Sequence, residues 1–124
     1  MKVAIPNDSG FVKQYFGRSK EFIIFDISDR EIKGHKVLST APFQHNYEEL
    51  AKLLVQEGVD TLILGSAGLR AIQTLQQHGL KVITGASGSV REAAVAYARG
   101  ALVTRKARWT RAMYTALNEP DFTI

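Results

Sequence analysis

Two glycine turns and one arginine are the residues of this chain best suited to hold a ligand. The turns are Gly65-Ser-Ala-Gly68 and Gly85-Ala-Ser-Gly88, and each follows a short apolar run and precedes an amphipathic stretch. Such a turn presents main-chain N–H groups at the start of a helix, a geometry that suits an anion. Arg18 adds a guanidinium, which clamps anions through charge-assisted hydrogen bonds. Together these residues predict a site for an anionic ligand held mainly by main-chain donors.

We expect five segments to converge on this site: the residues after the first strand, a Phe-Gly-Arg segment, a loop that carries a histidine, and the two glycine turns. The predicted ligand contacts are Asn7, Phe16, Gly17, Arg18, Gly65, Ser66, Gly68, Gly85, Ser87 and Gly88, and the predicted metal ligand is His45. Arg70 and Arg91 fall in the first turns of the two helices that follow the glycine turns, so they add positive charge to the same edge.

Each of these features also has a purely structural interpretation. Glycine is common in turns between strands and helices because it turns the chain, and Phe16 suits packing beneath a loop while Arg18 stays solvated. A lone loop histidine such as His45 is more often a surface residue than a ligand. A closed zinc site is excluded because the chain has no cysteine and no second histidine near His45. A single imidazole still suits a preassembled metal cluster.

The acidic residues do not indicate catalysis. Metal-dependent nucleases hold their ions with several carboxylates that meet at one point. Here Asp8 follows the first predicted strand, Asp26 lies near the far end of the second, and Asp60 precedes the fourth. Because these carboxylates do not converge, we expect a binding protein and not an enzyme.

The glycine turns belong to a pattern that occurs twice between residues 58 and 103. Each copy comprises a short strand, a turn and a helix, with strands predicted at 61–64 and 81–84 and helices at 68–78 and 89–99. Successive units of this kind build a parallel sheet, and ligands bind beyond the carboxyl ends of its strands. Both turns are therefore expected at one edge of the sheet.

The rest of the chain completes an α/β domain. Strands are predicted at 2–6, 21–27 and 31–39, and a helix begins at Asn46, which has Glu49 three positions on as in a capping box. Short hairpins and right-handed crossovers favour a mixed five-stranded sheet in the order 3-2-1-4-5, with strand 2 antiparallel and helices on both faces. This is the three-layer ribonuclease H-like arrangement. We expect one domain over residues 1–103 and a helical extension over 104–124.

Composition is that of a soluble globular protein, with 45% hydrophobic and 23% charged residues in 124. No apolar run approaches the roughly 20 residues of a membrane helix. We expect a cytoplasmic protein, although the absence of cysteine would also suit an exported one. The net charge of +4 gives little indication of a nucleic-acid partner. In the extension, Trp109 and Met113 belong to an apolar stripe, which predicts a helix that docks on the domain or on a second subunit of a homodimer. The alternative is a basic arm that binds an acidic partner protein.

Taken in order, several of these segments resemble one known family. They are Met1-Lys-Val-Ala-Ile-Pro-Asn7, Tyr15-Phe-Gly-Arg18, Gly58-Val-Asp60, Gly65-Ser-Ala-Gly68-Leu-Arg-Ala71, Gly79-Leu-Lys-Val82 and Gly85. The resemblance is to the dinitrogenase iron–molybdenum cofactor biosynthesis family, which includes NifX-like and NafY-like proteins and the C-terminal domain of NifB. It covers about residues 2–103.

This resemblance implies a function. Better-studied members carry iron–molybdenum cofactor or its precursor clusters between assembly proteins, so we expect a non-catalytic carrier for an anionic metal–sulfur cluster or a precursor such as molybdate. Its partners would be metal-cluster assembly or acceptor proteins. Many members have histidine where this chain has Tyr15, and a stretch rich in His or Cys where it has Pro42-Phe-Gln-His45. The alternative is therefore a metal-free regulatory or interaction module that binds a small anion.

Overall fold

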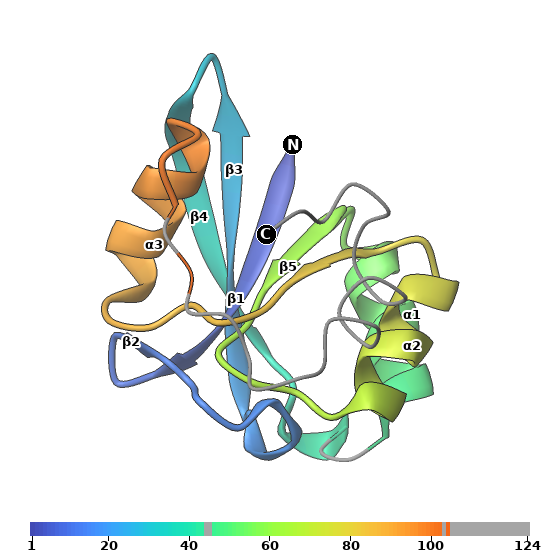
Figure 1. Cartoon of the computed structure of the whole chain (residues 1–124). Coiled ribbons are helices and arrows are strands. Elements are labelled where there is room, and N and C mark those ends of the chain that lie inside the picture. The colour runs from blue at the N-terminus through green and yellow to red at the C-terminus, as the bar shows by residue number, and fades with distance from the viewer. Residues whose placement is uncertain (44–45, 103, 105–124) are drawn as a thin grey trace, which may run out of the picture.

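A mixed sheet with helices on both faces forms the body of the protein in a computed structural model that describes residues 1–43, 46–102 and 104 (Figure 1). Its strands are β1 (Lys2–Asp8), β2 (Phe11–Val12), β3 (Glu21–Ser28), β4 (Glu31–Ser39), β5 (Thr61–Ile63) and β6 (Lys81–Ile83). The order is β4-β3-β1-β5-β6, and β2 pairs with β1 off this path. Strand β3 runs antiparallel to β1 and β4, whereas β1, β5 and β6 are mutually parallel.

The predicted mixed α/β architecture is confirmed, but the sheet has six strands where the sequence predicts five in the order 3-2-1-4-5. The additional strand is β2, which pairs with the end of β1 through Asn7–Val12 and Asp8–Phe11. Two residues are too few to show the alternation by which a strand is recognised. The extra strand changes the numbered order, and the finer assignment to the ribonuclease H-like fold stays a prediction.

Three helices begin and end close to where their capping residues predict. They are α1 (Tyr47–Gln56), α2 (Leu69–Gln77) and α3 (Val90–Ala98), and single 3-10 turns occur at η1 (Phe16–Arg18) and η2 (Ala41–Phe43). The side chain of Asn46 accepts a hydrogen bond from the Glu49 N–H at 3.3 Å, and that of Ser89 accepts one from the Glu92 N–H at 3.2 Å. Helix α2 differs, because Gly68 at its N-cap provides no side-chain acceptor.

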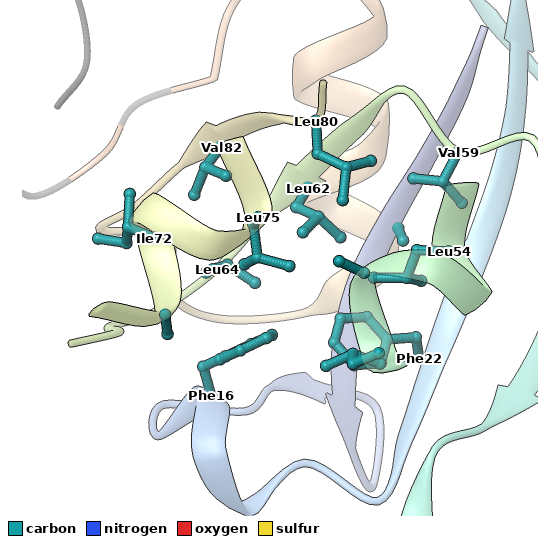
Figure 2. Close-up of a cluster of buried hydrophobic side chains, with 14 of the residues drawn as sticks. Phe16, Phe22, Leu54, Val59, Leu62, Leu64, Ile72, Leu75, Leu80 and Val82 are labelled. Atoms are coloured by element: carbon teal, nitrogen blue, oxygen red, sulfur yellow. The ribbon is translucent and has the colours of Figure 1, made fainter. Parts of the chain in front are cut away.

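The sheet separates two apolar clusters. One lies under α1 and α2 and includes Phe22, Leu54 and Leu75, which converge in Figure 2. The other lies under α3 and includes Ile5 and Phe25. Helices α1 and α2 therefore cover one face and α3 covers the other, as Figure 1 shows. Among the described helices, none combines the length and apolar character needed to cross a membrane.

Strand β1 changes neighbour halfway along its length. It pairs with β5 only at Val3 and Ala4, and beyond that point the chain itself returns beside it as β2. Pro6 stands at the change, where its carbonyl accepts a hydrogen bond from the Lys13 N–H at 2.9 Å. Proline has no main-chain N–H to donate, so it fits at a point where one side of the strand changes its paired neighbour. The returning segment leads directly to the candidate site.

Two sequence predictions lie outside the described residues. They are the loop histidine His45 and the terminal helix with Trp109 and Met113, whose residues beyond Thr104 are not described.

Candidate functional site

Residues 10–16, which we call the strap, bind to both glycine turns at the strand-end edge. At one end of the strap, the Val12 N–H donates to the Gly88 carbonyl at 2.8 Å and the Val90 N–H donates to the Gly10 carbonyl at 3.0 Å. At the other end, the Ser66 N–H donates to the Gln14 carbonyl at 2.8 Å. The Phe16 N–H donates in turn to the Ser66 carbonyl at 3.1 Å. The strap and the two glycine turns are therefore joined by main-chain hydrogen bonds, whereas the loop with His45, which the sequence also predicts at this edge, lies outside the described residues.

Gln14 joins the strap to both turns, and sequence reasoning missed it. Its carbonyl accepts a second hydrogen bond from the Ser66 hydroxyl at 2.7 Å, and its side-chain amide donates to the carbonyls of Val12 at 3.2 Å and Ala86 at 3.4 Å. A Cβ at Gly65 would lie 2.9 Å from the Gln14 Cα. Gly65 is therefore a glycine because the strap passes against it. No local motif marks Gln14, since its partners are 52 and 72 residues away.

The two glycine turns also contact each other directly. The Gly85 N–H donates to the Gly65 carbonyl at 2.7 Å, and the Ala86 N–H donates to the Leu64 carbonyl at 3.0 Å. The outer parts of both turns stay exposed. Within the described part of the chain, no acceptor engages the main-chain N–H groups of Ala67, Gly68, Ser87 and Gly88. Two neighbouring turns therefore offer unengaged main-chain donors at one edge of the molecule.

Asn7 uses its side chain to shape the start of the strap. Its carbonyl oxygen Oδ1 accepts a hydrogen bond from the Gly10 N–H at 2.9 Å, and its amide Nδ2 donates to Glu21 Oε2 at 2.6 Å. Both polar ends of the amide are thus occupied within the protein. The structure places Asn7 at the predicted edge, where it positions the turn that leads into β2.

The Phe16-Gly-Arg18 segment divides between core and surface. The ring of Phe16 is 2% exposed, lies edge-on to Phe22 at 6.0 Å between centroids and stacks on Tyr47 at 5.8 Å. Figure 2 shows this ring directed into the cluster beneath α1 and α2. The packing agrees with the structural interpretation of Phe16, and its contact with a ligand stays a prediction. Gly17 and Arg18 complete η1, and the Arg18 side chain is exposed.

The predicted arginines do not all gather at one place. Arg70 lies exposed in the first turn of α2, next to Gly68. Arg91 instead lines a hollow on the side of α3, together with Arg30 and Arg99. Across the described residues, no group of three or more His, Cys, Asp or Glu side chains is arranged to hold a metal ion.

The family of this chain is shown by its match to known proteins. The model of the dinitrogenase iron–molybdenum cofactor family matches residues 1–100, which is most of the chain. The chain belongs to this family. The resemblance found in the glycine and Phe-Gly-Arg motifs is thereby confirmed, and the family links the chain to iron–molybdenum cofactor and nitrogen fixation.

Several members and structural neighbours are similar over most of their length. The solved structure of PH0822 is 30% identical, with a TM-score of 0.76 over 85% of this chain and 96% of that one. A NifB-like protein of Thermotoga is 29% identical, with a TM-score of 0.60 over 86% and 98%. The uncharacterised protein MJ0580 of Methanocaldococcus jannaschii is 27% identical over 82% of this chain and 89% of its own length. The apo form of the orange protein from Desulfovibrio gigas shares the fold at 23% identity, with a TM-score of 0.70 over 86% and 93%.

Proposed function

We propose that this protein is a non-catalytic carrier that binds an anionic metal–sulfur cluster, of the iron–molybdenum cofactor type, or a precursor such as molybdate. One observation carries the proposal: two adjacent glycine turns hold unengaged N–H groups of Gly68 and Gly88 at the same edge. Membership of the family supports it. We also propose that the mixed sheet has the ribonuclease H-like topology. Metal-cluster assembly or acceptor proteins in the cytoplasm are the proposed partners.

The binding mode follows from the donors at the site. The first main-chain N–H groups of α2 have no side-chain acceptor, and the helix dipole adds partial positive charge at the same point. Arg18 would add a charge-assisted hydrogen bond to an anionic cargo, and His45 would be its imidazole ligand. Because the chain has no cysteine, no thiolate bonds form to the cargo. Cargo held by hydrogen bonds and charge exchanges readily, as delivery to an acceptor requires.

Metal retention tests the proposal directly. The full chain is incubated anaerobically with isolated iron–molybdenum cofactor and, separately, with molybdate, then desalted and analysed for metal. We expect a ratio of cargo to protein near one for at least one probe. A ratio near zero for both probes would show that the protein is not a carrier of this cargo.

Substitutions at the strand-end edge test whether the cargo binds there. We expect Arg18→Ala to weaken retention by about tenfold or more, the loss expected for a hydrogen bond to a charged group. If His45 is a ligand, His45→Ala has a similar effect. Lys52→Ala is the control, because Lys52 is an exposed residue of α1 that pairs with Glu49 at 3.5 Å. Unchanged retention in both Arg18→Ala and His45→Ala would place the cargo elsewhere.

A metal-free anion-binding module is the second candidate function. Tyr15 is 68% exposed at the position where many family members have histidine, so one imidazole is replaced by a phenol at the edge itself. Thermal-shift measurements with phosphorylated metabolites, molybdate and tungstate separate the two functions. A rise in melting temperature with phosphorylated metabolites alone would favour the metal-free module.

A further inference from the structure

A second site candidate lies along α3, away from the glycine turns. The turn between β3 and β4 and the exposed side of α3 enclose a hollow of about 490 Å³. Ile32, Val95 and Ala98 give it an apolar floor, and three arginines surround it: Arg30, Arg91 and Arg99. Its volume is within the range of about 300–1,000 Å³ that is usual for small-molecule sites.

The arginines come from different elements and keep their charge available. Arg30 lies in the β3–β4 turn, Arg91 in the first turn of α3, and Arg99 at the C-cap of α3. Among the described residues, no carboxylate lies within ion-pair distance of any of the three guanidiniums. Residues 91, 95 and 99 share one side of the helix because they are spaced by four. The two α3 arginines therefore flank Val95 on one side of the helix.

Arg30 is preorganised. It has a left-handed backbone, with φ of +63°, at a position of a two-residue hairpin where glycine is usually preferred. Its guanidinium crosses to α3 and donates to the Arg99 carbonyl at 2.5 Å, so it caps the helix C-terminus and offsets the negative end of the dipole there. An arginine held in this way loses little conformational entropy when it binds an anion.

Negative charge at the hollow is limited. Glu31 lines it but is paired with Lys33 at 3.1 Å. Asp29 is the other carboxylate that lines this hollow, to which three arginines also contribute. A second hollow, of about 590 Å³, continues on the other side of Arg91 and Arg99. Glu92 lines the second hollow. The surface along α3 thus combines three arginines with apolar side chains and few carboxylates, and it is larger than a single carboxylate or phosphate.

We propose that this surface binds a small organic polyanion, a molecule with at least two carboxylate or phosphate groups on a short apolar frame. The Cα atoms of Arg91 and Arg99 are about 12 Å apart along α3, at about 1.5 Å per residue, so their guanidiniums engage separate anionic groups. Ile32 and Val95 contact the frame between them. Guanidinium groups match carboxylate and phosphate in two-pronged geometry, which a lysine does not. This binding is independent of the cargo site at the glycine turns.

Titration calorimetry on the full chain tests this site with citrate and, separately, with adenosine diphosphate. The two probes distinguish a polycarboxylate ligand from a phosphorylated one. We expect saturable binding of at least one probe, weakened by about tenfold or more in Arg91→Ala and in Arg99→Ala. Arg91→Lys should weaken binding as well, because the charge remains while the two-pronged contact is lost.

Arg70→Ala is the matched control, since Arg70 holds the same place in α2 as Arg91 holds in α3. Binding should be unchanged in this variant, and cargo retention should be unchanged in Arg91→Ala. The inference is wrong if neither probe binds the wild-type protein, or if Arg70→Ala weakens binding as much as Arg91→Ala does. It is also wrong if Arg91→Lys binds as the wild type does, since general charge attraction would then suffice.

Discussion

Gly65 and Phe16, which the sequence predicts as ligand contacts, both have a structural role at the candidate edge. Gly65 has no room for a side chain because the backbone of Gln14 occupies that space. Phe16 supplies a ring to the core from the same segment that exposes Arg18. Both residues belong to the family-like motifs, so the motif at these two positions also preserves the packing that holds the edge together.

Gly65→Ala tests the close approach of the strap. The added methyl would lie 2.9 Å from a backbone atom and 3.0 Å from the Gln14 side chain, so the strap must shift. We expect a loss of about 1–3 kcal/mol in the free energy of unfolding, measured by urea denaturation, as in other overpacked sites. Gly34→Ala is the control, because a Cβ there meets nothing within 4 Å. Equal stability of the two variants would mean that the strap yields freely.

Phe16→Ala tests whether the ring is primarily a core residue. Removal of this buried side chain should lower the free energy of unfolding by about 3–5 kcal/mol, since it leaves a cavity next to Phe22. Tyr15→Ser, one position earlier, should change stability little because Tyr15 is 68% exposed. If Phe16→Ala unfolded at the same urea concentration as the wild type, the packing described for this ring would be wrong.

At the scale of elements, the two helices that follow the glycine turns begin differently. Ser89 caps α3 with its hydroxyl, whereas Gly68 leaves the start of α2 without a side-chain acceptor. Gly68 has φ of −71°, which any residue adopts, and open space where a side chain would point. Neither backbone conformation nor packing requires a glycine here. The main-chain N–H groups at the start of α2, which no side chain caps, suit an anionic ligand.

Gly68→Ser therefore separates stability from binding. A serine hydroxyl would cap α2, and we expect a gain of a few tenths of a kcal/mol, about 0.3, in the free energy of unfolding. The same hydroxyl would occupy the N–H groups offered to the cargo, so metal retention should fall. Gly68→Ala keeps those groups open and should retain cargo as the wild type does. Equal retention by the serine and alanine variants would show that the start of α2 takes no part in binding.

At the scale of the whole molecule, the sheet divides the protein into two cores. Ile72 is a fully buried residue of α2 that faces the sheet-side cluster of α1 and α2, and Ile5 is fully buried on the α3 side. The two side chains share no cluster. Because both faces belong to one sheet, we expect the protein to unfold as a single unit while each face responds to its own substitutions.

Ile72→Val and Ile5→Val test this division. Each should lower the free energy of unfolding by about 0.5–1.5 kcal/mol. Together, their effects should add to within about 0.3–0.5 kcal/mol, because residues without shared partners act independently. Urea denaturation of the single and double variants provides the measurement. A larger departure from additivity would show that the sheet transmits packing changes between its faces.

Local chemistry made most of the fold predictable. Asn46 and Ser89 cap helices as their spacing indicates, and the βα pattern locates both glycine turns within one or two residues. The strap was not predictable, because its bonds join Gln14 to partners more than 50 residues away and leave no periodic signal. The same limit applies to Arg91. The sequence predicts that Arg91 lies in a helix. The side of the protein to which Arg91 belongs, however, depends on which face of the sheet α3 covers.

We expect the contacts between the strap and the glycine turns to form late in folding. The strap pairs locally with β1 through Pro6 and Asn7, but the groups that join it to the glycine turns belong to Ser66, Gly88 and Val90, which leave the ribosome much later. Contacts so distant in sequence form late, since the entropy of closing the intervening chain must first be offset. The strap therefore closes after β5 and β6 have joined the sheet. A nascent or clipped chain that lacks the second turn therefore has no completed strand-end edge.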